Sequence, residues 1–189
     1  HQSGLTIGRY TGDTKNNPEV ALSEYIYLTK REEPYDCELL SRKEIQQNPP
    51  DILMTNYVML ELLLTRFEDR TLFRHEGVLK YLVLDEIHTY SGKQGADVAA
   101  LIRRLKQHTG TIGELRCIGT SATVESSEGV SAQESVANFA SDLFGETFHP
   151  ENVIGERYAP IETATEGEIR KIVQALSEGP KPLNVLADT

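Results

Sequence analysis

The stretch YLVLDEIHTYSG, residues 81–92, places four apolar residues directly before two adjacent acids, Asp85 and Glu86, with His88 two positions later. A continuous apolar run of this length is typical of a strand that is buried on both faces in a parallel sheet. In open α/β sheets, ligands bind outside the carboxyl ends of the strands, which is where the two acids would lie. The segment therefore predicts a strand that ends at a binding or catalytic site.

Two further apolar runs, DILM (51–54) and LRCIG (115–119), have the same character, and we expect them to be strands buried on both faces. Helical patterns lie between and after these runs, and several begin with a capping box or end at a glycine or proline. The expected helices cover residues 19–30, a short segment after Ser41-x-x-Glu44, 57–66, 94–107, 131–144 and a segment after Thr165. This alternation predicts an α/β fold with a mostly parallel sheet flanked by helices. We expect one domain over residues 1–154, followed by a linker or accessory helical segment over 155–189.

Composition narrows the class of protein. Of the 189 residues, 39% are apolar, which is normal for a globular protein, and no run approaches the ~20 apolar residues of a membrane span. Cys37 and Cys117 form no CxxC motif, so they indicate reduced thiols of a cytoplasmic protein rather than zinc ligands. The net charge of −10 argues against a basic nucleic-acid-binding surface. It does not exclude binding through backbone N–H groups or through the Arg and Lys side chains of another domain.

Polar residues follow each predicted strand. The segment GTSAT (119–123) fits a tight turn that hydrogen-bonds carboxylates or an imidazole, and TNY (55–57) fits a helix start that binds a phosphate. YTGDT (10–14) is a glycine turn flanked by hydroxyls. For each of these segments, an ordinary turn or helix N-cap without a functional role is the alternative interpretation. Paired carboxylates suit Mg²⁺, with one acid holding the ion through water while the other deprotonates a water that attacks phosphorus.

The order of these segments resembles the first RecA-like domain of a superfamily-two helicase of the DEAD/DEAH-box type. DEIH (85–88) resembles motif II, the Walker B motif, and SAT (121–123) resembles motif III. PPDILMTNYVMLE (49–61) resembles the motif Ib region, and YTGDT resembles the glycine-containing motif before it. The segment DEIHTYSGKQGADVAALIRRL (85–105) is similar to the same region of Hrq-like and MrfA-like DNA helicases. The likeness extends over about residues 5–155.

The resemblance implies ATP and Mg²⁺ as cofactors and a role for each motif. Asp85 would coordinate Mg²⁺ through water, Glu86 would contact the same ion and act as general base, and His88 would link the ATP site to motif III. Motif III would couple the ATP state to the grip on nucleic acid through Ser121, Ala122 and Thr123. The residues expected along the nucleic-acid backbone are Thr11, Gly12, Thr55 and Asn56.

The sequence departs from the family pattern at one point, because it contains no GxxxxGK[ST] loop to cradle phosphates. The resemblance implies that the Walker A strand precedes residue 1 and that a second RecA-like domain follows residue 189. We therefore expect a domain truncated at its N-terminus and inactive alone, whose partners are those two segments and nucleic acid, DNA rather than RNA. Two alternatives stay open. One is a non-catalytic helicase-like scaffold that binds nucleic acid or a partner, and the other is a metal-dependent hydrolase or nuclease with further ligands around Asp85 and Glu86.

Overall fold

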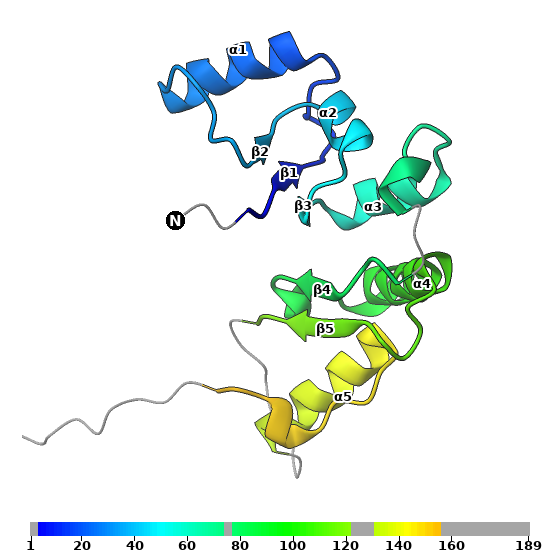
Figure 1. Ribbon diagram of the computed structural model, residues 1–189. Coiled ribbons are helices and arrows are strands. Elements are labelled where there is room, and N and C mark those ends of the chain that lie inside the picture. The colour runs from blue at the N-terminus through cyan, green and yellow to red at the C-terminus, as the bar shows by residue number, and fades with distance from the viewer. Residues whose placement is uncertain (1–3, 74–76, 122–130, 156–189) are drawn as a thin grey trace, which may run out of the picture. The chain divides into compact units, whose positions relative to one another are not determined.

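A computed structural model describes residues 4–73, 77–121 and 131–155 of the chain (Figure 1). Contacts between residues divide the chain into a unit of His1–Val153 and a unit of Ile154–Thr189. The fold and the site described below belong to the first unit. The helix expected after Thr165 lies outside the described residues, and the domain boundary at 154 stays a prediction.

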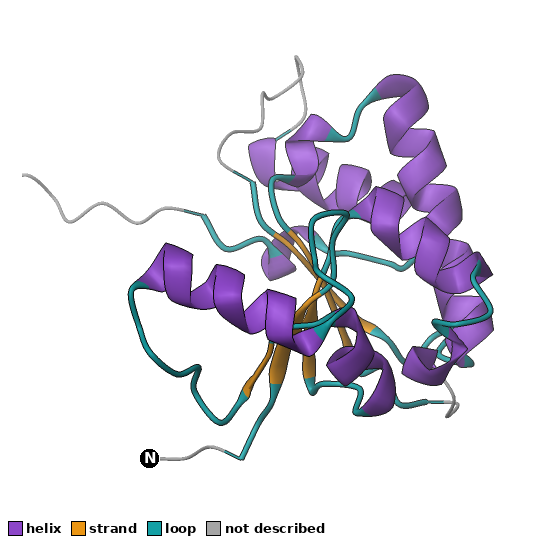
Figure 2. Cartoon of the chain, turned by 90° about the horizontal axis from the view of Figure 1, so that it is seen from above, coloured by secondary structure: helices purple, strands orange, loops and turns teal. Residues whose placement is uncertain are grey.

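All the strands of the described part pair in parallel, as the apolar runs predicted, and they form two sheets. The first sheet has the order β2-β1-β3 and the second pairs β4 with β5. The strands are β1 (Ile7–Arg9), β2 (Glu38–Leu39), β3 (Ile52–Met54), β4 (Tyr81–Leu84) and β5 (Arg116–Gly119). Figure 2 shows the strands grouped together, with most of the helical segments gathered beside them. The expected α/β architecture is therefore confirmed.

The expectation that the strands are buried on both faces was wrong. In β4 and β5 the burial alternates along the strand, so that Leu82 and Cys117 pack inward while their neighbours face outward. Val83 is 58% exposed and Ile118 is 46% exposed, and these two residues are directly opposite each other. Met54 of β3 is also 54% exposed. One apolar face of the strands is therefore uncovered in the described structure, although parallel sheets normally have both faces covered.

The helices begin and end where the sequence provides capping residues. They are α1 (Pro18–Thr29), α2 (Arg42–Gln47), α3 (Tyr57–Thr65), α4 (Gly92–Thr109) and α5 (Ala132–Phe144). Ser41 and Glu44 form the predicted capping box at the start of α2, and the Ser131 side chain accepts a hydrogen bond from the Glu134 amide at the start of α5. Gly110 and Gly145 end α4 and α5 in the left-handed conformation. No helix of the described residues is long and apolar enough to cross a membrane.

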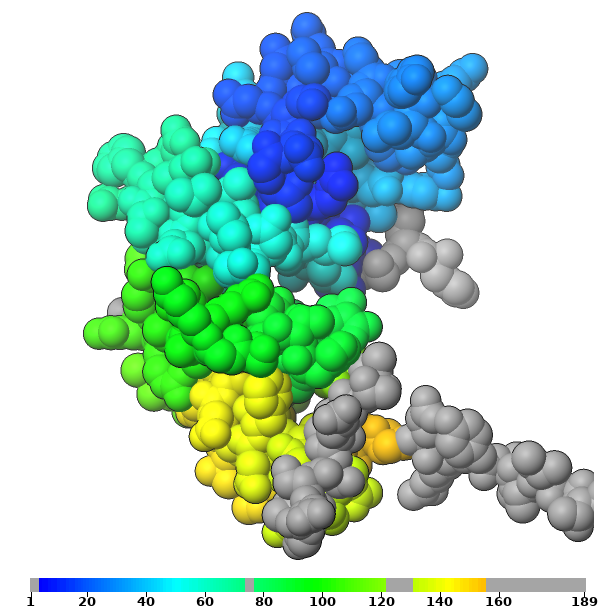
Figure 3. All heavy atoms as spheres, turned by 180° about the vertical axis from the view of Figure 1, so that it is seen from behind, coloured from blue at the N-terminus to red at the C-terminus, as the bar shows by residue number. Residues whose placement is uncertain are grey.

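One core lies beneath the carboxyl end of β4 and holds the segment after it. Val98 and Ile102 of α4 pack with Leu143 and Phe144 of α5 and with Ile87, which follows the two acids. All five side chains are at most 3% exposed. Contacts run from α3 to α4 and from α4 to α5, and Figure 3 shows these segments in succession. Ile87 thus anchors the predicted site to both helices.

A buried ion pair joins α4 to the end of α5. The Lys106 ammonium lies 2.5 Å from a carboxylate oxygen of Glu146 and donates to the Phe144 carbonyl at 2.8 Å. The Lys106 side chain is 4% exposed and that of Glu146 is 29% exposed. A cation at this position also stabilises the C-terminal carbonyls of α5. The pair therefore fixes the distance between the two helices that support the site.

Candidate active site

Asp85 and Glu86 directly follow β4, and the backbone around them is bonded to the residue that follows β5. The Thr120 amide donates to the Leu84 carbonyl at 3.0 Å, and the Ile87 amide donates to the Thr120 carbonyl at 2.8 Å. These bonds extend the ladder past the end of both strands. The strand end predicted to carry the acids is therefore tied on both sides to the GTSAT segment.

Glu86 has left-handed backbone angles, with φ 52° and ψ 48°, which a non-glycine residue adopts only at a cost of about 1–2 kcal/mol. The residues after it form a 3₁₀ turn, Ile87–Thr89, in which the Thr89 amide and hydroxyl both donate to the Glu86 carbonyl. Burial of Ile87 fixes this turn from below. Gly119 leaves space for it, since a Cβ there would lie 2.8 Å from Ile87 Cδ1. The strained conformation is thus held by packing and by hydrogen bonds on both sides.

Thr120 holds the first acid, and the sequence did not single it out within GTSAT. Its hydroxyl donates to Asp85 Oδ1 and also lies 3.2 Å from the Glu86 amide, which reaches Asp85 Oδ1 at 3.1 Å. The register of β4 with β5 would have identified Thr120, because Gly119 pairs with Leu84 and the next residues after both strands therefore lie side by side. Thr120 therefore fixes one oxygen of Asp85 at the strand end.

His88 lies between the second acid and motif III. Its Nδ1 atom is 3.2 Å from Glu86 Oε2 and 3.1 Å from Ser121 Oγ. A ring nitrogen that carries a proton donates to one of these oxygens at a time, and without the proton it accepts from the serine hydroxyl. The structure thus brings together four predicted residues, Asp85, Glu86, His88 and Ser121. Ala122 and Thr123 lie outside the described residues.

The four residues predicted along nucleic acid also lie together, at the carboxyl ends of β1 and β3. Arg9 pairs with Met54 at the last position of the two strands, so the turn that contains Thr11 and Gly12 follows β1 at the same edge where Thr55 and Asn56 follow β3. The Thr55 hydroxyl donates to the Tyr10 carbonyl at 2.7 Å. The Asn56 side chain caps α3 by accepting from the Met59 amide. The Thr55 side chain thus holds the end of β1, and the Asn56 side chain is the N-cap of α3, as one interpretation of the sequence had it. Contact of the four residues with nucleic acid stays a prediction.

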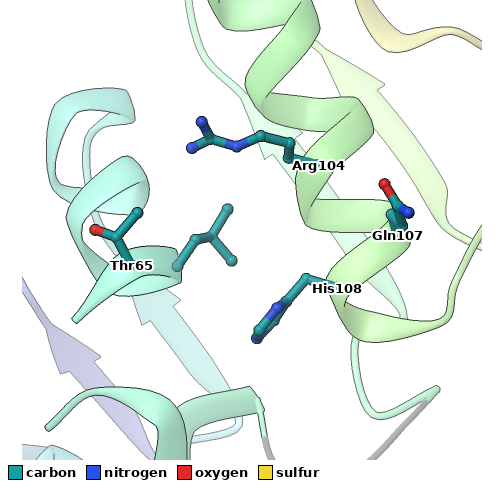
Figure 4. A pocket seen from close by; sticks show the side chains of 5 residues that line it. Thr65, Arg104, Gln107 and His108 are labelled. Carbon is teal, nitrogen blue, oxygen red and sulfur yellow. The ribbon is translucent and has the colours of Figure 1, made fainter. Parts of the chain in front are cut away.

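Two hollows of the described structure lie elsewhere, between α3 and α4. One of about 360 Å³ is lined by Leu64, Thr65, Arg104, Gln107 and His108 (Figure 4). Figure 4 shows Arg104 extending from α4 toward α3, where it forms a 3.4 Å ion pair with the exposed Glu61. A second hollow of about 400 Å³ shares Arg104 with the first. Neither is lined by a predicted site residue.

The carboxylates of Asp85 and Glu86 suit a hard cation, although they do not enclose one. Both side chains are exposed, and no group of three or more His, Cys, Asp or Glu side chains that could hold a metal occurs among the described residues. Mg²⁺ typically uses one or two carboxylates and takes its remaining ligands from water and substrate phosphates. The residues present therefore fit a magnesium ion that arrives with a phosphate ligand.

A model of the DEAD/DEAH box helicase family matches residues 23–129, which is more than half of the chain and includes the acids and the SAT segment. The chain is 43% identical over 122 residues to the Druantia protein DruE of Escherichia coli (strain UMEA 4076-1). It is 38% identical over 98 residues to the Lhr helicase/uracil glycosylase of Escherichia coli (strain K12). These matches cover 60% and 51% of this chain, and each spans 6% of the relative's length.

The family match explains why parallel strands flanked by helices carry two acids at the end of β4, beside the turn that follows β5. The matched range contains the whole of this arrangement, from β3 to the residues after β5. The chain therefore belongs to the DEAD/DEAH box helicase family and has the RecA-like α/β fold of its motor domain.

Proposed function

We propose that the chain is the part of an ATP-dependent DNA helicase or translocase that supplies the Walker B motif and motif III of the motor. One observation carries this proposal. The two acids at the end of β4 are linked to the residues after β5, because Thr120 donates directly to Asp85 and His88 contacts both Glu86 and Ser121. A change at the carboxylates is thereby passed to motif III over hydrogen bonds alone.

Within this proposal Asp85 and Glu86 have different roles. Asp85 would hold Mg²⁺ through water, and the bond from Thr120 fixes the direction in which its carboxylate points. When bound, Mg²⁺ neutralises charge on the triphosphate, which is the main electrostatic term in phosphoryl transfer. Glu86 would contact the same ion and accept a proton from the attacking water, and its left-handed backbone sets the angle at which the side chain leaves the turn.

His88 provides the proposed link between ATP state and nucleic-acid grip. Its Nδ1 atom lies within 3.2 Å of both Glu86 Oε2 and Ser121 Oγ, and one ring nitrogen forms a good hydrogen bond with only one of them at a time. A change in the hydrogen bonding of Glu86 therefore strengthens or weakens the bond between His88 and Ser121. Motif III, comprising Ser121, Ala122 and Thr123, would then couple the ATP state to the grip on nucleic acid. The turns at Thr11 and Gly12 and at Thr55 and Asn56 follow the nucleic-acid backbone.

DNA is the proposed substrate, in preference to RNA. The support is the likeness of residues 85–105 to the corresponding region of Hrq-like and MrfA-like DNA helicases. The chain alone is proposed to be inactive, since it has no GxxxxGK[ST] loop to hold the triphosphate. Isothermal titration of the 189-residue chain with Mg-ATP tests the second point, and micromolar affinity would contradict it.

The decisive experiment compares Glu86→Gln with Glu61→Gln in the full-length protein encoded by the gene. Glu61 is an exposed acid on α3 that pairs only loosely with Arg104, so it controls for loss of one charge. ATP hydrolysis is measured with and without single-stranded DNA. We expect DNA-stimulated turnover that falls ~10²-fold or more in Glu86→Gln and is retained in Glu61→Gln.

Each of the other outcomes has a distinct meaning. An intact protein that binds DNA without turnover would favour the non-catalytic scaffold. Turnover that is indifferent to Glu86 would show that this residue is not the general base. Equal stimulation by RNA and DNA would remove the proposed preference for DNA while leaving the motor assignment in place.

A further inference from the structure

Arg42 lies where it can control the turn that follows β1. This residue is the first of α2, and its Nη2 atom donates to both the Thr11 and Gly12 carbonyls at 2.9 Å. Its own amide donates to the Lys15 carbonyl at 2.9 Å. One side chain from α2 therefore holds two consecutive peptide units of the Thr11–Thr14 turn.

The orientation of those carbonyls determines where the adjacent amides point. In a trans peptide the C=O and the following N–H point in opposite directions. Because the Thr11 and Gly12 carbonyls face Arg42, the N–H groups of Gly12 and Asp13 face away from it. Neither amide donates a hydrogen bond within the described part of the chain. Two successive outward amides form the kind of concavity that binds anions.

Arg42 is itself held on two sides. The capping box of Ser41 and Glu44 fixes its backbone at the start of α2. Its guanidinium lies 5.4 Å from the ring centroid of Tyr10, a side chain that is 1% exposed. The Tyr10 hydroxyl in turn donates to the buried Asp69 at 2.5 Å. The guanidinium therefore acts from a fixed position on the inner side of the turn.

We propose that Arg42 is a positioning residue that turns the Gly12 and Asp13 amides outward to receive a backbone phosphate of single-stranded DNA. This rests on the proposed function and specifies how one of its nucleic-acid-facing turns binds. Arg42 acts through the peptide units and does not touch the phosphate. Its positive charge polarises both peptide units in the direction that favours an anion at their N–H groups.

The first test compares Arg42→Met with Lys43→Met in the full-length protein. Methionine keeps an unbranched side chain without the guanidinium at position 42, and the exposed Lys43 is the next residue, so both variants lose one positive charge from the same helix end. Binding of a fluorescein-labelled oligo-dT is followed by anisotropy over a range of salt concentrations. We expect Arg42→Met to weaken binding about tenfold, and Lys43→Met to stay within about twofold of wild type.

Salt dependence separates positioning from direct contact. A side chain that neutralises a phosphate contributes about −0.7 to the slope of log K against log salt for single strands. Arg42→Met should leave the slope unchanged, because the contacting groups are neutral amides. A slope that becomes shallower by about 0.7 would mean that Arg42 binds phosphate directly. Equal affinities of the Arg42→Met and Lys43→Met variants would also overturn the proposal.

A second pair of variants keeps the test valid if Arg42→Met does not fold. Gly12 is the second residue of the turn, its φ is not left-handed and a Cβ there meets nothing within 4 Å. Proline is favoured at this turn position and removes the N–H, while alanine keeps it. Gly12→Pro should weaken oligo-dT binding about tenfold more than Gly12→Ala does, with the same melting temperature for both variants. Equal effects of the two would contradict the role of the amide, and wild-type protein that binds no DNA would overturn the proposed function itself.

Discussion

The strained backbone of Glu86 gives a prediction that separates stability from activity. Its φ of 52° is a backbone conformation that glycine adopts without strain but that a residue with a Cβ adopts at a cost. Glu86→Gly and Glu86→Ala both lose the carboxylate and its 3.2 Å contact with His88, so these losses cancel between them. The remaining difference is the left-handed cost of a Cβ, about 1 kcal/mol after allowing for the greater freedom of glycine in the unfolded chain. We therefore expect the glycine variant to be more stable than the alanine variant by about that amount.

Urea unfolding of the 189-residue chain measures this difference, which corresponds to a melting shift of about 2–4 °C for a chain of this size. ATP turnover of the full-length protein is measured beside it, and both variants should lose it. The two variants would then differ in stability while sharing the loss of turnover, because the strain belongs to the backbone at position 86 and the activity to the carboxylate. Equal stabilities of the two variants would refute the claim that the backbone at Glu86 is strained.

Four other changes test separate parts of the molecule. Thr120→Val removes the hydroxyl that bonds the first acid, so turnover of the full-length protein should fall about tenfold while urea unfolding shifts by less than about 1 kcal/mol, since the site is exposed. Glu146→Gln should destabilise the chain by about 2 kcal/mol, more than Lys106→Met does, because it leaves a buried ammonium without its charged partner. Burial, followed by the bond to a buried carboxyl, raises the pKa of Tyr10 from 10 to about 12. The stability it contributes is therefore complete below pH 10 and lost from about pH 10 to 12, and Tyr10→Phe should flatten that part of a pH titration of unfolding. Asp13→Asn removes an exposed negative charge beside the proposed phosphate site, so oligo-dT affinity should rise about two- to fivefold.

Helix ends could be predicted from the sequence because their signals are local. The hydroxyl of Ser41 and the carboxylate of Glu44 are three positions apart, which is the distance that a capping box spans in any protein. Gly145 ends α5 because it adopts a φ of 67° at no steric cost. The buried stripe of α4 was also readable, since Val98 and Ile102 repeat at helical spacing and both are 1% exposed. None of these features depends on what lies far away along the chain.

Strand burial and the individual partner of each acid depend on distant residues. The sequence therefore predicted the burial wrongly and located the partners only to the GTSAT segment. An apolar run shows that Val83 can be buried, but what covers each face of a strand is decided by other segments. Thr120 lies 35 positions after Asp85, and only the register of β4 with β5 brings the two together. Arg42 lies about 30 positions from the carbonyls that it binds, on a helix whose cap was predicted but whose side-chain contacts were not.

The net charge of −10 and a role in binding a polyanion are compatible if the contacting groups are neutral. Peptide N–H groups bind phosphate without adding net charge. A single half-buried cation such as Arg42 can orient and polarise two of these groups at once, through the carbonyls of the same peptide units. A turn of this kind contributes affinity without the counterion release that makes Lys and Arg contacts salt-dependent. Any steep salt dependence of DNA binding in the full-length protein should therefore arise from residues other than this turn. Replacing Gly12 by proline should accordingly lower affinity by the same factor at low and at high salt.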